Sequence, residues 1–490
     1  MSKESSPASS NTKQREWDLV IYGATGDAGK AIAWYIANNV DSYKKSTRHS
    51  NNRGDGNVEV NGSDSSIFRW AIAGRSGSKL NTLRSQIIVG RSGHSTVDEI
   101  GILTADSTCP NNTNQLAKSA RLVVSAVGPY TRLGENIYAA CVENGTNYVD
   151  ITGEVDWVLH MREKYGERAR ETGSTLCSFS GYDSVPSDIT IYAARRVLSE
   201  CDATDLGDAS DNNGEVSLSC AETVVEVNSG AMPRGTIRTM ITKLPDGPQF
   251  CRDLVRFASS KNEGSERMVV KSLVWWLLPR WSADYGAFTL PHFMGWCNIP
   301  VVYNSCSSID CTYHDRIGIP FSQGCLGTGY GLLQTLVLYL FLLATAPFFL
   351  IFQTIVVLVP SLSEFLLKAF DSFQYRGNTP QNQKLMENST VDVWTYATSA
   401  SSGSQARVHL HVKGDAGIKC TALLACETAF SILELDDANK LPRGVIGSPS
   451  MIAGDALVDR LQDEDAIGDF CTLTVTVVDG EDDNDTKKKK

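Results

Sequence analysis

Short apolar runs and helical patterns alternate along residues 17–179, and this alternation limits the chain to few folds. The apolar runs have the length of strands and lie at 19–22, 69–73, 99–103, 122–127, 148–150 and 175–179. Strands that alternate with helices of roughly 10 to 15 residues are typical of βαβ units, whose strands form a parallel sheet. We therefore expect an α/β fold with a doubly wound parallel sheet over residues 16–195.

A glycine-rich turn follows the first strand directly and precedes the first helix. Its residues are Gly23, Ala24, Thr25, Gly26, Asp27, Ala28 and Gly29. Glycines in such a turn let the backbone approach a pyrophosphate, which binds at the N-terminus of the helix. The pattern favours a Rossmann-type dinucleotide site formed by these residues. The alternative is a loop that only resembles such a site.

The end of the second strand bears on the choice of cofactor. NAD-binding chains usually have an acidic residue there, which holds the ribose 2′-hydroxyl. This chain has Arg75 and Ser76 instead, with Lys79 close behind. A guanidinium and a hydroxyl group suit a 2′-phosphate, so we expect NADP rather than NAD. The alternative for Arg75 is an ordinary surface arginine.

Polar side chains also follow the later strands. Ligands of an open α/β sheet bind at the carboxyl ends of its strands, so these groups should share one crevice. Asp106 is expected beside the adenine, and Gly128 and Pro129 beside the nicotinamide ribose. The candidates for a catalytic acid or base are Tyr130, Glu154, Tyr182 and Asp183. The alternative role for each candidate is loop capping or turn hydrogen bonding.

Beyond residue 195 the pattern changes to alternating polar and apolar residues. Expected strands lie at 222–227, 235–241, 406–412 and 418–425. Alternation with a period of two is typical of antiparallel strands with one buried face. We therefore expect residues 196–440 to form a second, α+β domain with a mostly antiparallel sheet.

The remaining segments are assigned by composition. Residues 1–15 and 480–490 are polar or charged, which predicts a disordered leader and a solvated tail. Residues 41–66 are polar and predict a long exposed insertion in the first domain. Residues 441–479 are expected to return to the first domain.

An apolar segment, 330–368, interrupts the second domain, and its residues 332–359 include no charged side chain. As one helix, 332–359 would measure roughly 42 Å, more than the ~30 Å hydrocarbon core of a bilayer. A single crossing would also separate two flanks that look like parts of one folded body. Because Pro347 divides the run, we expect a helical hairpin that enters one leaflet of a membrane or lipid droplet. A tilted single span and a buried helical pair are the alternatives.

Charge and composition exclude several classes of function. The net charge of −11 argues against nucleic-acid binding, which needs clustered Lys and Arg. Thirteen cysteines include no CxxC pair or Cys/His cluster at metal spacing, so no metal site is expected. His409 and His411 lie two apart, but the sequence shows no partner ligand. The N-terminus lacks the apolar core of a signal peptide, so we expect a protein that faces the cytosol.

Four motifs follow one another in the first domain: GATGDAG, AIAGRS, SAVGPYTRLGENIYAACVENGTNYVDITGE and FSGYDSVPSD. Together they resemble the saccharopine dehydrogenase-like oxidoreductase family over residues 17–195. The resemblance implies an NADP domain with cofactor contacts at Gly23, Gly26, Gly29, Arg75, Ser76, Gly128 and Pro129. The family is also similar to bacterial enoyl reductases that act in trans in glycolipid assembly, and its eukaryotic members are associated with lipid droplets and other membranes.

Three interpretations of the function remain open. The first, which we expect, is an NADP-dependent oxidoreductase that acts on a lipid or other apolar substrate at a lipid-droplet or endoplasmic reticulum surface. The second is a catalytically silent protein of the same surfaces that retains the nucleotide-binding fold. The third is a soluble saccharopine-type amino-acid dehydrogenase, although residues 200–330 show no basic pocket for a diacidic amino acid. A homodimer and a mitochondrial association stay open.

Overall fold

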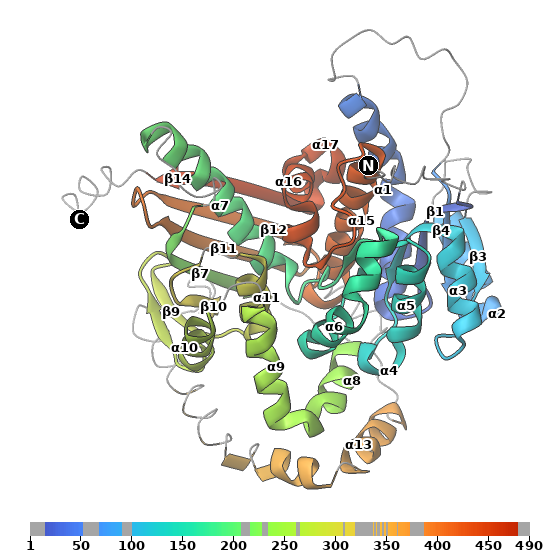
Figure 1. Ribbon diagram of the computed structural model, residues 1–490, viewed down its shortest axis with the longest axis horizontal. Helices are drawn as coiled ribbons and strands as arrows, with labels where there is room; N and C mark the ends of the chain where they lie inside the picture. The colour runs from blue at the N-terminus through green and yellow to red at the C-terminus, as the bar shows by residue number, and fades with distance from the viewer. Residues whose placement is uncertain are drawn as a thin grey trace, which may run out of the picture.

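The computed structural model describes ten segments and single positions between 337 and 348. The segments are 15–51, 68–90, 100–206, 216–227, 234–260, 265–306, 309–318, 351–359, 361–372 and 387–478. Two seven-stranded sheets lie side by side and form the framework (Figure 1). Residues 1–14 of the expected leader, residues 52–66 of the expected insertion and the expected tail lie outside the described residues.

The first sheet is parallel throughout, with the strand order β13-β6-β5-β4-β1-β2-β3. Its strands are β1 (Trp17–Tyr22), β2 (Trp70–Gly74), β3 (Ile100–Thr104), β4 (Ala120–Ser125), β5 (Asn147–Asp150), β6 (Leu176–Cys177) and β13 (Ile446–Gly447). The direction in which the chain adds strands reverses between β1 and β4. Doubly wound sheets bind ligands at this switch point.

Helices cover both faces of the first sheet. One face carries α1 (Asp27–Asn51), α2 (Gly77–Gly90) and α15 (Thr421–Asp437). The other carries α3 (Pro110–Ser119), α5 (Glu135–Glu143) and α6 (Val155–Thr172). Leu19 and Ile21 of β1 pack into one core, while Val20 and Tyr22 pack into the other. This strand is apolar on both sides because both of its faces are covered.

The second sheet has the order β14-β12-β11-β7-β10-β9-β8. Its strands are β7 (Leu218–Val227), β8 (Arg280–Ser282), β9 (Ala287–Pro291), β10 (Tyr313–Gly318), β11 (Thr390–Ser399), β12 (Gln405–Lys413) and β14 (Cys471–Val478). β7 and β10 pair in parallel, and all other neighbours are antiparallel. Its buried face packs on α7 (Val185–Leu206), α10 (Glu266–Trp276), α11 (Gly295–Ser305) and α16 (Pro449–Gln462). The expected fold class is confirmed.

Two of the strands expected in the second domain are wrong. The segment 235–241 lies in a helix, α8 (Arg234–Lys243), where Thr239 and Lys243, four residues apart, both reach Glu154. The segment 418–425 covers the end of a short π-helix (Ala416–Cys420) and the start of α15, whose residues 421–433 are all buried. An apolar run buried on every side has the same composition in a strand and in a core helix.

The helix Ala416–Asp437 is the one described helix that is long and apolar enough to cross a membrane, and 78% of its apolar window is buried in the protein. It packs against α1 and α16. We therefore assign it to the core. This helix lies in the range expected for the second domain, yet it covers the parallel sheet.

Three further differences from the expected elements concern helix α1, Arg15 and helix α7. Helix α1 continues to Asn51, eleven residues into the expected insertion (41–66), because Tyr43 is buried and stacks on Phe430 at 4.7 Å. Arg15, placed in the expected leader, donates hydrogen bonds to the carbonyl oxygens of Ala117 and Lys118. Helix α7 was not expected from the sequence, although it supplies much of the second core.

The described part of the apolar segment is mainly exposed. Ile351, Phe352, Ile355 and Leu358 are between 36% and 75% exposed, which contradicts a buried helical pair at these positions. A bend of 109° separates Ile351–Leu358 from Ser361–Ala369, the first part of α13 (Ser361–Ser372). Pro347, where we expected the hairpin to turn, is helical. The observed bend lies instead between Leu358 and Ser361.

Candidate functional site

The glycine turn has the backbone geometry of a phosphate-binding loop. Gly23 has φ +87°, a left-handed conformation that favours glycine. A Cβ on Gly29 would lie 2.2 Å from the Gly23 carbonyl oxygen, so only glycine lets the helix pack against the turn. Gly26 is exposed, and a Cβ there would meet only that carbonyl, at 3.4 Å. The open side of Gly26 therefore lies where a pyrophosphate approaches the N-terminus of α1.

The ends of β2 and β3 lie next to this turn. The amide groups of Gly23 and Ala24 donate to the Ala73 carbonyl oxygen, so β1 and β2 end together. Arg75 is exposed and forms no salt bridge with a described residue. Asp106 accepts hydrogen bonds from the backbone and hydroxyl groups of Thr108, which lower the pKa of its carboxyl group. A free guanidinium at this edge fits a ribose phosphate better than a ribose diol.

The candidates at the ends of β4 and β5 are joined by hydrogen bonds. Gly128 and Pro129 lead into the short helix α4 (Tyr130–Leu133). The Glu154 carboxylate accepts hydrogen bonds from the backbone amides of Tyr130 and Thr131, at 2.7 and 3.0 Å, and caps this helix. The Tyr130 hydroxyl donates to the Ser125 carbonyl oxygen at 2.8 Å, and burial raises its pKa well above the ordinary value. Both side chains thus have structural partners.

Lys243 of α8 lies over the same corner, and it was missed in the sequence because we expected a strand there. Its side chain is 9% exposed, and its ammonium group lies 3.7 Å from Glu154 and 3.6 Å from Asp246. It also forms a salt bridge with Asp156. One buried cation among three carboxylates fixes α8 against the ends of the parallel strands.

Asp183 differs from the other three catalytic candidates. Its carboxylate lies beside Gly153, where a Cβ would be 3.2 Å from Oδ2. Within the described part of the chain, no hydrogen bond reaches this carboxylate. Burial raises its pKa to about 6, against an opposing effect of His292. A carboxyl group with a pKa near 6 and no structural partner is suited to proton transfer.

Tyr182 belongs to a buried chain of polar groups that joins the two domains. Asp315 Oδ1 lies 2.9 Å from His292 Nδ1, and His292 Nε2 lies 3.4 Å from the Tyr182 hydroxyl. His292 and Asp315 are 4% and 0% exposed. A carboxylate at Nδ1 favours a proton on that nitrogen, which leaves Nε2 to accept from the tyrosine. No spacing in the sequence links these two residues, since they come from β10 and the turn after β9.

Asp150 is the last residue of β5, and its side chain bonds to the residues that follow β6. Its carboxylate accepts from the Thr152 and Phe179 amides and from the Ser178 hydroxyl. The side chain is 0% exposed, and burial raises its pKa to about 7. Its partners are all structural, so we assign it to the scaffold of the site.

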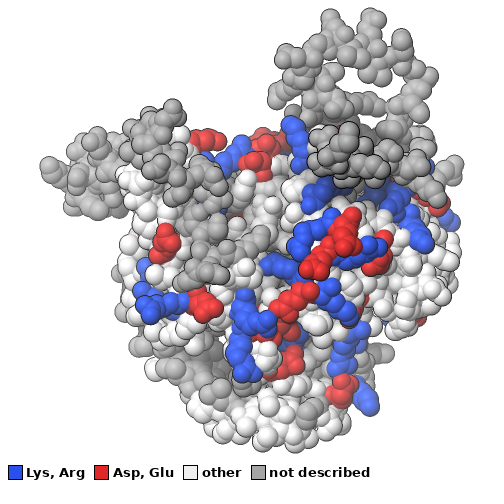
Figure 2. Space-filling model, viewed as in Figure 1, with Lys and Arg blue, Asp and Glu red and all other residues white. Residues whose placement is uncertain are grey.

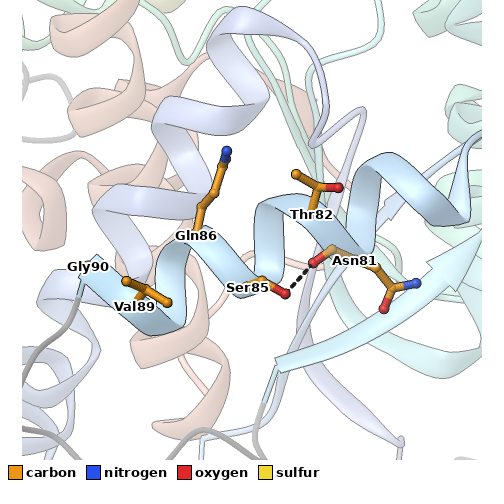
Figure 3. A pocket seen from close by; sticks show the side chains of 6 residues that line it. All are labelled: Asn81, Thr82, Ser85, Gln86, Val89 and Gly90. Atoms are coloured by element: carbon orange, nitrogen blue, oxygen red, sulfur yellow. Dashed lines mark hydrogen bonds between the residues drawn. The ribbon is translucent and has the colours of Figure 1, made fainter.

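Two other features of the molecule lie away from the crevice. A hollow of about 640 Å³ on the outer side of α2 is lined by Asn81, Thr82, Ser85, Gln86, Val89 and Gly90 (Figure 3). None of these side chains titrates. His409 and His411 lie within 2.9 Å of Asp392 Oδ1, and no cluster suited to a metal ion occurs among the described residues.

Comparisons with known proteins agree with this geometry. Residues 55–177 match the family described as the saccharopine dehydrogenase NADP binding domain. A rat protein named saccharopine dehydrogenase-like oxidoreductase is 28% identical over 470 residues, which cover 92% of this chain and 96% of that protein. A Mycobacterium tuberculosis protein named as a trans-acting enoyl reductase is 28% identical over 456 residues, 91% of this chain and 96% of that protein.

Two further matches cover a smaller part of this chain or have a lower sequence identity. A Caenorhabditis elegans protein named lipid droplet localized protein is 32% identical over 175 residues, 36% of this chain and 35% of that protein. The solved structure of apo saccharopine dehydrogenase (L-Glu forming) from Saccharomyces cerevisiae covers 94% of this chain and 100% of that one, at 11% identity and a TM-score of 0.42. The strand orders of the two sheets define the fold.

The parallel sheet, its glycine turn and the matched domain define the class: an NADP-dependent oxidoreductase. More particularly, residues 55–177 match the saccharopine dehydrogenase NADP-binding domain, and the chain is similar over nearly its whole length to a saccharopine dehydrogenase-like oxidoreductase.

Proposed function

We propose that this oxidoreductase reduces a lipid or another apolar substrate at the surface of a membrane or lipid droplet. The observation that carries the proposal is the exposure of Ile351, Phe352, Ile355 and Leu358 on the same chain as the nucleotide site. The names of the enoyl reductase and lipid-droplet relatives support it. A cytosol-facing lipid droplet or endoplasmic reticulum surface is the proposed location.

The exposed apolar residues are linked to the nucleotide domain by short contacts. Glu364 of α13 forms a salt bridge with Arg132 of α4, which follows Gly128 and Pro129. Helix α13 also packs on α8, whose Lys243 approaches Glu154. These contacts hold the apolar segment near the end of the crevice where the nicotinamide is expected, so a substrate dissolved in lipid has a short path to it.

The residues of the site divide into four roles. NADPH, when bound, supplies a hydride from its nicotinamide ring to a carbon of the substrate, and reduction is completed by one proton. Gly23, Gly26, Gly29 and Arg75 hold the dinucleotide, with Ala24, Thr25, Asp27, Ala28, Ser76, Asp106, Gly128 and Pro129 around it. Asp183 donates the proton from its carboxyl group. Tyr182, held by His292 and Asp315, positions the substrate beside Asp183, while Tyr130 and Glu154 fix the loop at β4.

A test of this function is NADPH oxidation by the full chain with lipid enals, enones and ketones presented in vesicles. Asp183→Asn should lower kcat by roughly 100-fold or more, because a positioned general acid contributes about that factor, and should leave the NADPH Kd unchanged. Since Asp183 must be protonated to donate, kcat should fall as the pH rises through about 6.

The matched control is Glu163→Gln, an exposed carboxylate on α6 whose salt bridge, within the described part of the chain, is with Arg256. It should keep the wild-type kcat and pH profile. Absence of NADPH oxidation by the wild-type chain across the whole panel would contradict the proposal and favour a catalytically silent nucleotide-binding protein.

A further inference from the structure

An apolar surface outside the 332–359 segment covers α10 and the strand after it. We call it the α10 patch; it consists of Val270, Val274, Trp275, Leu277, Leu278 and Trp281. Each of these side chains is between 41% and 57% exposed. The opposite side of α10 packs inward through Val269 and Ser272, so the helix is held firmly with its apolar outer face uncovered. Contiguous exposed apolar side chains of this kind mark an interaction site.

The patch lies on the same margin of the molecule as the apolar segment. Helix α10 packs on α9 (Gly247–Ser259), a short 3-10 turn joins α9 to α8, and α8 packs on α13. Figure 1 shows α8, α9, α10 and α13 along the lower part of the protein. In Figure 2 the lower margin is largely white, while charged side chains gather above it. One flat partner could therefore touch both the patch and residues 351–359.

The side chains around the patch favour a lipid surface over a protein partner. Residues 266–282 contain three basic side chains, Arg267, Lys271 and Arg280, against one acidic one, in a chain of net charge −11. All three are exposed, and none forms a salt bridge with a described residue. Basic side chains beside exposed tryptophans suit the boundary between anionic headgroups and acyl chains.

We propose that the α10 patch is a second lipid-contacting surface, which inserts Trp275 and Trp281 at the headgroup boundary and binds anionic headgroups through Arg267, Lys271 and Arg280. The proposal rests on the proposed membrane function and deepens it. Two separate contacts, at α10 and at 351–359, fix the orientation of the protein on the lipid. The opening of the crevice then faces the layer in which the substrate is dissolved.

The test uses the full chain and vesicles of phosphatidylcholine with and without phosphatidylserine, with no NADPH or substrate present. Brominated phosphatidylcholine should quench part of the tryptophan fluorescence, and the double variant Trp275→Phe/Trp281→Phe should bind vesicles but lose most of that quenching. Val274→Asp/Leu277→Asp should weaken vesicle binding roughly tenfold or more. Lys271→Glu should weaken binding only to vesicles that contain phosphatidylserine.

The matched control is Val89→Asp, because Val89 is 78% exposed on α2, outside this margin. It should leave vesicle binding unchanged. Equal quenching in the wild type and the tryptophan double variant would overturn the proposal. So would a wild-type dimer that Val274→Asp/Leu277→Asp converts to a monomer without loss of vesicle binding, since a second copy would then cover the patch. NADPH binding and oxidation, measured separately, decide the proposed catalytic function independently of these outcomes.

Discussion

At the scale of single residues, the site separates groups with structural partners from groups without them. Both oxygens of Glu154 are used to cap α4, and the Tyr130 hydroxyl is bonded to a backbone carbonyl. Asp183 and Arg75 have no such partners among the described residues. The sequence places all four at strand ends, but only the folded structure separates those used by the scaffold from those left for ligands.

Arg75 is expected to select the phosphorylated cofactor. Replacing it with Ala removes one charge-assisted contact to the 2′-phosphate, which is worth about 1.5–3 kcal/mol, or roughly 10- to 100-fold in the NADPH Kd. The NADH Kd should change little, because NADH lacks that phosphate. Titration of cofactor fluorescence measures both constants. Arg84→Ala, on the helix α2 that follows Arg75, is the control, and an equal loss for both cofactors would contradict the assignment.

Asp150 should make the stability of the protein depend on pH. Its pKa is about 7 in the folded state against 3.8 ordinarily, so the folded state binds the proton more tightly than the unfolded state does. Its contribution to stability is therefore full below about pH 4 and is lost as the pH rises to about 7. Asp150→Asn keeps an acceptor oxygen for the amides of Thr152 and Phe179, and its amide group donates to the Ser178 hydroxyl in place of accepting from it, without the charge.

The free energy of unfolding of the Asp150→Asn variant should therefore fall less between pH 4 and 7 than that of the wild type, by a few kcal/mol. Urea unfolding at several pH values measures the difference. The same pH dependence in both proteins would show that this carboxyl group does not carry the shift.

At the scale of elements, the parallel sheet could be predicted and part of the second domain could not. Every strand of the first sheet up to Leu176–Cys177 follows from short apolar runs that alternate with helices. The strand predictions for 235–241 and 418–425 were wrong because β-branched and apolar residues suit both a strand and a packed helix. His292 and Asp315 were missed for another reason: their proximity comes from tertiary pairing of distant elements.

The glycine turn provides two variants that separate packing from cofactor binding. Gly29→Ala would place a Cβ 2.2 Å from the Gly23 carbonyl oxygen, so it should lower the unfolding free energy by about 1–3 kcal/mol and weaken NADPH binding. Gly26→Ala has room within the protein and should keep the wild-type Tm, yet weaken NADPH binding because its methyl group points to the pyrophosphate. Thermal unfolding and NADPH titration, made on both variants, check this. Loss of stability without loss of binding in Gly26→Ala would contradict the assigned role.

At the scale of the whole molecule, the two domains are built into each other. The chain leaves the parallel sheet after β6, forms most of the second sheet, returns with α15 and β13, and ends in β14 of the second sheet. The buried chain from Asp315 through His292 to Tyr182 crosses between them. Both flanks of the apolar segment thus belong to one body, as the sequence predicted, and the segment cannot cross a membrane once without dividing it.

Deleting 332–359 should move most of the protein from the membrane fraction to the soluble fraction, because the deletion removes an uncharged apolar run while leaving both sheets intact. Flotation of cell membranes and lipid droplets measures the change. An unchanged NADPH Kd would show that the variant is folded. Continued flotation with membranes would refute the role of this segment.

The central claim is hydride transfer from NADPH to a lipid-dissolved substrate, and isotope transfer tests it most directly. NADPH carrying deuterium at the nicotinamide C4 position is incubated with the full chain and vesicles that contain lipid enals, enones and ketones. Mass spectrometry should find one deuterium in a reduced lipid with the wild-type chain, and far less with Asp183→Asn. Saturable NADPH binding without deuterium in any lipid would contradict the claim.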